Sequence, residues 1–173
     1  MHFSAQISSV NSKELVLLPR KVSLQFPSRG MAMAQGTVNN ISMIMPLEPD
    51  GKGSHWFEVN KPLLKKLKAK VGDTVEIEFE PTKDWPEPKI PTDFKKALVA
   101  DPKAYQTWKK TTPIARWDWI RSIRSTHNPE TRKKRIEVAC SKLSSGKPRQ
   151  CCFNRSMCTV PEVAKSGILL DIH

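Results

Sequence analysis

A proline-rich segment divides the chain into two parts with different residue periodicity. Residues 81–91 read PTKDWPEPKIP, in which four of eleven positions are proline. Proline fixes φ and lacks a backbone donor, so neither a helix interior nor a central strand accommodates that density. Apolar residues alternate with period two before this segment and recur at helical spacing after it. We therefore expect an α+β protein with a β-barrel domain at 1–80, a semi-rigid linker at 81–91, and a helical region with an irregular tail at 92–173.

The first part predicts short strands joined by turns. The clearest strand is TVEIEFE, residues 74–80, in which Val75, Ile77 and Phe79 share one side and glutamates occupy the other. Further strand patterns are FSAQISS, ELVLL, AQGTVNNI, SMIMPLEP and SHWFEV, separated by turn-forming residues. Asn60 is suited to cap a short helix, KPLLKKLKA, with one leucine-rich face.

The second part predicts four helices. A short helix spans residues 92–100, and Asp101 followed by proline begins the second. Thr112 and Asn128, each also followed by proline, begin the third and fourth. The fourth helix should end near residue 145, since Gly146 favours the left-handed conformation found just past helix ends.

Two arginines fall on the apolar faces of the longer helices. Those faces consist of Trp119, Ile120 and Ile123 in the third helix and Ile136, Ala139, Cys140 and Leu143 in the fourth. Arg116 and Arg132 lie on the same stripes, and a buried guanidinium needs a partner. Either they bind protein carboxylates, with Asp118, Glu130 and Glu137 nearby, or they join Trp117 in a pocket for a small anion or peptide beside the barrel.

Positive charge is concentrated in the second part. The net charge is +12, and residues 103–149 hold thirteen Lys and Arg against three acids. A candidate basic surface comprises Arg121, Arg124, Lys133, Lys134 and Arg135. Such a surface suits the phosphates of a nucleic acid, although basic helices are also commonly just solvated faces. Nucleic-acid binding through residues 113–145 is therefore an alternative function.

Neither a metal site nor a catalytic site is predicted. Cys140, Cys151, Cys152 and Cys158 lack the paired spacing of zinc ligands, and His2, His55, His127 and His173 are scattered along the chain. We expect no catalytic residue, no metal and no cofactor. The chain has no membrane-spanning apolar run and no signal-peptide pattern at its start, so we expect a cytoplasmic protein with reduced thiols.

Several motifs of the first part resemble a known family. They are Leu17–Pro19, Gly36–Asn39, the PDGKG turn at 49–53, and Val71–Val75. Through them residues 2–80 resemble a bacterial domain-of-unknown-function family built as a double-split β-barrel. The resemblance implies a barrel of the class shared with AbrB/MazE-type DNA-binding proteins.

Residues 91–155 resemble the YdeI/OmpD-associated family. The matching residues are Pro91, Asp93-Phe94, Ala97-Leu98, Trp119-Ile120, Glu130-Thr131-Arg132, Arg135-Ile136, Gly146-Lys147 and Cys151–Asn154. One departure is Arg121-Ser122, where the family often has Ala-Lys. Members are labelled bacteriocin-protection or porin-associated proteins, and no catalytic residues come with the resemblance. The labels imply a bacterial protein with a binding or stress-protection role. Together with the candidate pocket at Arg116, Trp117 and Arg132, they lead us to expect a non-enzymatic protein whose partner is a small anion or another protein.

Overall fold

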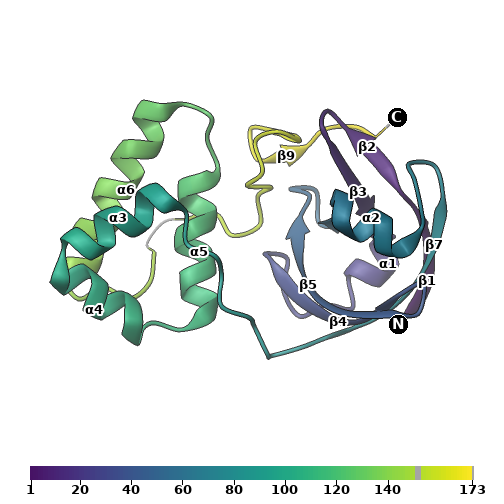
Figure 1. The fold of residues 1–173 in the computed structure, drawn as a ribbon, viewed down its shortest axis with the longest axis horizontal. Helices are drawn as coiled ribbons and strands as arrows, with labels where there is room; N and C mark the ends of the chain where they lie inside the picture. Colours follow the sequence, from purple (N-terminus) through teal and green to yellow (C-terminus); the bar gives the residue numbers. More distant parts are fainter. Residues whose placement is uncertain (151–152, 173) are drawn as a thin grey trace. The chain divides into compact units, whose positions relative to one another are not determined.

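The structure, a computed structural model, describes residues 1–150 and 153–172 (Figure 1). Its contacts divide the chain into two compact units. The sheet unit comprises Met1–Asp84 with Arg155–His173, and the helical unit comprises Trp85–Asn154. The sequence placed residues 155–173 with the helices, whereas these contacts group them with the sheet. The expected order of a β domain followed by helices is confirmed.

Within the described residues, seven strands form one antiparallel sheet in the order β1-β7-β4-β5-β6-β3-β2. The strands are β1 (His2–Gln6), β2 (Ser8–Val10), β3 (Lys13–Leu17), β4 (Ala32–Val38), β5 (Ile41–Pro49), β6 (His55–Glu58) and β7 (Thr74–Pro81). The sheet curls into a half-barrel (Figure 1), and β1 packs near β3. The predicted α+β class with a barrel-like N-terminal sheet is thus confirmed, in the form of a half-barrel.

Apolar and acidic residues alternate along β7, which gives the strand one buried and one solvated face. Val75, Ile77 and Phe79 are buried, and the glutamates between them are exposed. The buried side joins Phe3, Ile7, Val16, Leu18, Phe26, Ala34, Val38, Leu47, Phe57 and Val59 in the core of the half-barrel.

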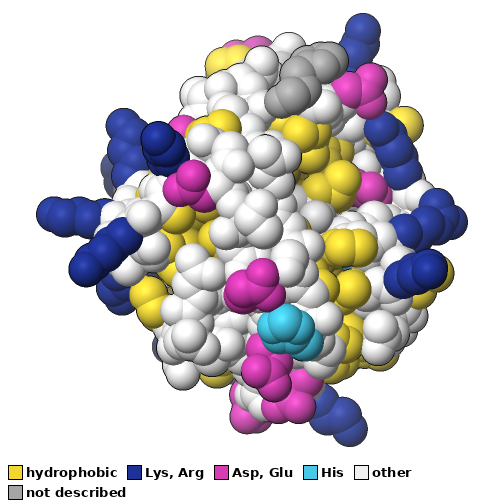
Figure 2. Space-filling view, turned by 90° about the vertical axis from the view of Figure 1, so that its right-hand side faces the viewer, with side chains coloured by type: hydrophobic (Ala, Val, Ile, Leu, Met, Phe, Trp, Pro, Cys, Tyr) yellow, Lys and Arg dark blue, Asp and Glu magenta, His cyan; other side chains and the backbone are white. Residues whose placement is uncertain are grey.

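Figure 2 views the sheet unit from its β1 and β7 side and shows acidic side chains gathered beside a histidine.

Two short helices complete this part of the sheet unit. Helix α1 (Arg20–Ser23) follows Pro19. Helix α2 (Lys61–Leu67) begins where the side chain of Asn60 accepts a hydrogen bond from the backbone N–H of Leu63, as the sequence predicted. Lys68, at φ 51°, ends α2 in the left-handed conformation.

Helices α3 (Thr92–Ala100), α4 (Pro102–Lys110), α5 (Pro113–Arg124) and α6 (Pro129–Ser144) form the helical unit. Asp101, Thr112 and Asn128 cap the last three with side-chain oxygens, so the predicted starts are confirmed. Gly146, at φ 86°, follows the end of α6. The predicted apolar stripes pack together with Phe94, Leu98, Ala104 and Trp108.

The C-terminal segment returns to the sheet. Strands β8 (Ala164–Lys165) and β9 (Ile168–Leu169) form a small hairpin in a stretch that the sequence predicted as irregular. Cys158, Val163 and Leu169 pack against Val10, Leu15 and Trp56. Buried Glu48 of β5 accepts hydrogen bonds from the backbone N–H and hydroxyl of Thr159. A buried carboxylate needs hydrogen-bond donors, and here the C-terminal segment supplies them. This segment is therefore a structural part of the sheet unit.

None of the helices in the described part of the chain is long and apolar enough to cross a membrane.

Candidate functional site

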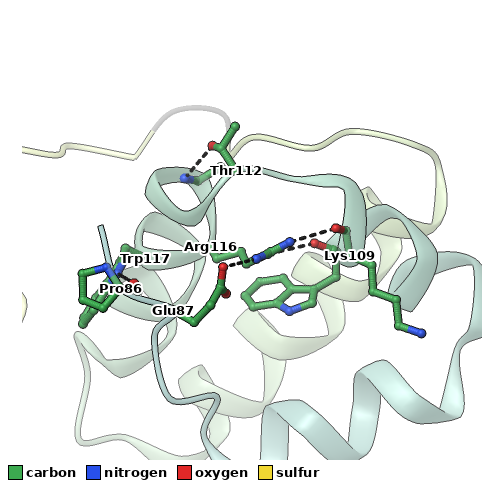
Figure 3. A network of polar contacts seen from close by, with 8 residues as sticks. Pro86, Glu87, Lys109, Thr112, Arg116 and Trp117 are labelled. Carbon is green, nitrogen blue, oxygen red and sulfur yellow. Dashed lines mark hydrogen bonds and ion pairs between the residues drawn. The ribbon is translucent and has the colours of Figure 1, made fainter. Parts of the chain in front are cut away.

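Arg116 is held between the end of one helix and the proline-rich segment (Figure 3). Its Nε donates to the carbonyl of Trp108 at 3.0 Å, and its Nη2 donates to the carbonyl of Lys109 at 2.8 Å. These carbonyls belong to the last turn of α4, where carbonyls lack the regular i+4 donor; the Trp108 carbonyl also accepts from the N–H of Thr111 at 3.2 Å. The third guanidinium nitrogen pairs with Glu87. Arg116 therefore caps α4 and fixes residue 87.

Trp117 makes a neighbouring attachment. Its indole Nε1 donates to the carbonyl of Pro86 at 2.9 Å (Figure 3). The adjacent side chains of Arg116 and Trp117 thus hold two consecutive residues of the segment that the sequence predicted to be a linker. That part of the segment, from Trp85 onward, belongs to the helical unit.

Arg132 forms a bidentate ion pair with Asp93 in the first turn of α3. Its Nε lies 2.7 Å from Asp93 Oδ2, and its Nη2 lies 3.0 Å from Oδ1. The hydrogen bond from Arg132 lowers the pKa of the Asp93 carboxyl, and Asp93 raises the pKa of Arg132. The partners of the two arginines are thus Glu87 and Asp93, not Asp118, Glu130 or Glu137 as the sequence suggested.

The candidate basic surface splits into buried and exposed members. Arg121 has no exposed side-chain area, lies 5.5 Å from the ring of Phe153 and 3.9 Å from Asp118, and therefore is not a surface residue. This corrects the sequence expectation. The five consecutive residues from Trp119 to Ile123 are all buried, so this part of α5 is enclosed around most of its circumference and the guanidinium lies in the interior.

The other four residues of the candidate basic surface also differ in how exposed they are. Arg135 donates through Nη1 to the carbonyl of Ser122 at 2.9 Å and to Ser125 Oγ at 2.6 Å, so it caps the end of α5. Arg124 is half-buried, whereas Lys133 and Lys134 are exposed. Of the five predicted surface cations, these two lysines are the ones that are exposed.

A groove in the sheet unit was not anticipated from the sequence. It encloses about 330 Å³ between the first half of β5, the end of β6 and α2. Its lining is largely apolar and includes Met43 and Met45 from β5, Phe57 from β6 and Leu63 from α2. Polar groups at its margin are Glu58, Asn60 and Lys66. A concave apolar surface with a few polar groups is the usual form of a binding site.

His55 belongs to a buried polar cluster beneath β6. Its Nε2 lies 2.7 Å from the carbonyl of Gly30, so Nε2 donates and Nδ1 accepts from the hydroxyl of Ser23 at 2.6 Å. Arg29 donates to the same hydroxyl at 3.3 Å. Burial is the main cause that lowers the pKa of His55, so the ring is neutral and structural.

The described cysteines are buried thiols. Cys140 and Cys158 are free, and burial, followed by the Asp101 carboxylate, raises the pKa of Cys140. No group of three or more metal-binding side chains occurs among residues 1–150 and 153–172. Cys151, Cys152 and His173 lie outside the described residues.

Comparison with known families gives two matches. Residues 3–79 match the model of a domain of unknown function, DUF1905. Residues 87–146 match the family described as Bacteriocin-protection, YdeI or OmpD-Associated. No curated protein matches the chain. The matches follow the order that the sequence motifs predicted.

Proposed function

We propose, on the premise that residues 3–79 match DUF1905 and residues 87–146 match the YdeI or OmpD-associated family, that this chain is a non-enzymatic binding protein with a role in stress or bacteriocin protection. The observation that carries the proposal is the apolar groove between β5 and α2. Its methionine side chains adapt readily to the shape of a bound partner. The groove, not the arginine pairs, is therefore the binding site that we propose.

The roles of the reactive side chains support a binding function over catalysis. His55 uses both ring nitrogens in buried hydrogen bonds, which leaves neither available to a substrate. The raised pKa of Cys140 disfavours the thiolate, which is the nucleophilic form. Arg116 and Arg132 are bound to Glu87 and Asp93. These groups stabilise the fold.

A survival assay tests the protective role. A bacteriocin-sensitive bacterial strain would express the chain, its Leu63→Glu variant or its Lys134→Ala variant, and surviving cells would be counted after bacteriocin treatment. The wild-type chain and Lys134→Ala should raise survival at least about tenfold over the empty vector. Leu63→Glu should not, because it places a charge in the groove. Equal survival with the wild-type chain and the empty vector would overturn the proposal.

Nucleic-acid binding is a second candidate. The observation that favours it is the pair of exposed lysines near the start of α6, Lys133 and Lys134. Other exposed cations of the helical unit are Lys89, Lys95, Lys96, Lys103, Lys109, Lys110, Lys147 and Arg149. Lysine is a point charge on a flexible stem, so this set favours binding to phosphates without sequence preference.

Fluorescence anisotropy with random duplex and single-stranded DNA, from low to physiological salt, tests the second candidate. If it holds, affinity is micromolar at low salt and weakens steeply as salt rises. The double variant Lys133→Glu, Lys134→Glu should then bind at least about tenfold more weakly, whereas Lys66→Glu in the sheet unit should not. Absence of binding at low salt would remove this candidate.

A further inference from the structure

One edge of β5 faces away from its neighbour β4. The hairpin between them turns at Asn39 and Asn40, both left-handed at φ 46° and 64°, and Val38 and Ile41 form the pair that closes it. In a two-residue hairpin the closing pair is hydrogen-bonded, and alternate pairs follow. The odd-numbered residues of β5 therefore bond to β4, and the even-numbered residues point to the other edge.

The opposite side of β4 supports this alternation. The N–H of Asn39 donates to the carbonyl of Glu76 at 2.8 Å, and the carbonyl of Met33 accepts from Thr82 at 3.0 Å. The odd-numbered residues of β4 thus form backbone hydrogen bonds with β7. The even-numbered residues of β4 form theirs with β5. On β5, the N–H of Asp50 bonds to the carbonyl of Ser54 at 3.0 Å, so even-numbered residues do face the outer edge.

The backbone pairing between β5 and β6 ends at a proline. The two strands pair at Glu48 with Trp56 and at Pro49 with His55. The next even-numbered residue is Pro46, which has no N–H to donate. β6 continues to Glu58, and there it pairs with β3 on its opposite edge, where Phe57 lies opposite Val16, while its pairing with β5 ends at Trp56. In the part of the chain that the structure describes, no strand pairs with the outer edge of β5 from residue 42 to residue 46.

This edge lies along the groove. Ser42, Met43, Met45 and Pro46 all line it, and Ile44 is 52% exposed. Ser42 and Ile44 each present an N–H and a carbonyl to the edge, and Pro46 presents a carbonyl. An edge with unpaired donors and acceptors is a template for another strand.

A lysine stands at the margin of the groove. Lys66 of α2 lines it, Lys61 and Lys65 are exposed on the same helix, and the first turn of α2 contains no acid. The one acid in the lining, Glu58, is paired with Lys13 at 3.0 Å. The groove therefore combines a largely apolar lining, a strand edge without a paired strand, and Lys66 at its margin.

We infer that the groove binds an extended peptide segment of a partner protein, which adds to β5 as a further strand at residues 42–46. Its backbone bonds to Ser42 and Ile44, alternate apolar side chains fill the space beside Met43, Met45 and Phe57, and an acidic flank meets the lysines of α2. Because α2 and β6 wall the groove, a single extended segment reaches the edge more readily than a folded sheet does. This inference rests on the proposed binding function and specifies its partner.

Amide hydrogen exchange measured by NMR on the full chain tests the inference. The probe is a blocked heptapeptide, EDVTVSV, at millimolar concentration, and the control is KKVTVSV. The first peptide should slow exchange at Ser42 and Ile44 at least about tenfold and leave Met43 and Met45 unchanged, since these already bond to β4. Lys66→Glu should weaken its binding at least threefold, an effect of about 0.7 kcal/mol, whereas Lys134→Glu should not.

Each other outcome contradicts the inference. No slowing at Ser42 and Ile44 with millimolar peptide means that the edge does not accept a strand. Slow exchange that depends on protein concentration alone means that a second copy of the chain occupies the edge. The survival assay separates the two proposals: protection without slowed exchange overturns only the peptide site, and slowed exchange without protection overturns only the protective role.

Discussion

At the scale of single residues, arginine and lysine have different roles in the helical unit. The planar guanidinium offers five donors in a fixed geometry, which suits helix-end carbonyls and carboxylates. Arg116 and Arg135 donate hydrogen bonds to carbonyls in the last turns of α4 and α5, and Arg132 forms an ion pair with Asp93. Lysines such as Lys133 and Lys134 lie in solvent. The count of positive charges in the sequence therefore overstates the basic surface.

Arg132→Ala should lower the free energy of unfolding of the helical unit by about 1 kcal/mol. The pair with Asp93 is bidentate but partly exposed, which limits its contribution. Lys134→Ala should change the free energy by less than about 0.5 kcal/mol, because its side chain is exposed. Urea unfolding of the full chain, followed by far-ultraviolet circular dichroism, measures both. Wild-type stability in both variants would contradict the structural role of the ion pair.

His55 should make the sheet unit less stable as the pH falls below neutrality. Its pKa in the folded state lies below the ordinary value of about 6.5, because burial disfavours the charged ring. Between these two values the unfolded chain binds a proton that the folded chain does not, so the free energy of unfolding decreases with decreasing pH. Above about pH 6.5 the ring of His55 is neutral in both the folded and the unfolded chain, so His55 no longer changes the free energy of unfolding with pH.

Unfolding measured from pH 8 to pH 5 checks this expectation. Arg29 opposes protonation of His55, while Asp50 and Glu48 favour it, and burial is the largest cause. His55→Gln should remove the decline in this window, whereas His127→Gln, at an exposed position, should retain it. The lowered pKa of Asp93 acts separately, below about pH 4. An unchanged slope in His55→Gln would refute the assignment.

At the scale of elements, close contact between strands explains one glycine. Gly36 in β4 has φ 150°, and a Cβ at this position would lie 1.8 Å from the carbonyl oxygen of Glu78 in β7. No side chain fits unless the two strands separate. The Gly36–Asn39 motif thus combines a close strand contact with the turn that begins the free edge of β5.

Gly36→Ala should destabilise the sheet unit by more than about 2 kcal/mol, because strand separation breaks hydrogen bonds and core packing. Gly72→Ala is the matched control: its φ is 97°, but nothing lies within 4 Å of the added Cβ. Its cost should be about 1 kcal/mol, from backbone strain alone. Thermal unfolding with near-ultraviolet detection compares them, and equal losses would contradict the steric argument.

At the scale of the whole molecule, the sheet unit depends on residues from both ends of the chain. The segment after residue 154 supplies donors to Glu48 and apolar side chains that cover Trp56. The Leu169 N–H also bonds to the carbonyl of Asp50 at 2.8 Å. The sheet unit therefore extends beyond the family match at residues 3–79 and includes a segment that follows the helical unit in the sequence.

Leu169→Ala should lower the stability of the sheet unit by about 2–4 kcal/mol, because it leaves a cavity beside Val10 and Leu15. Ile168→Ala should cost less than about 1 kcal/mol, since that neighbouring side chain is 42% exposed. Hydrogen exchange of the amides in β3 and β6 measures the difference. Equal protection in the two variants would show that the C-terminal segment does not stabilise the sheet.

Local patterns were sufficient to predict most elements. The helix starts at Asp101, Thr112 and Asn128 follow from capping chemistry within a few residues, and the alternation of β7 follows from its half-buried position. The resemblance to two families was likewise carried by short motifs. These are interactions between residues close in sequence, which a single sequence displays.

Only the tertiary structure identified the partners that lie far apart in the sequence. Arg116 pairs with Glu87 and Arg132 with Asp93, across 29 and 39 positions, and helical spacing alone pointed to nearer acids. The groove likewise arises where Pro46 ends the pairing of β5 with β6, a pairing that no local pattern specifies. The sequence by itself determined most of the elements, because capping and periodicity are local. The structure decided which charges are buried and where a strand edge is open, because both depend on how distant segments pack.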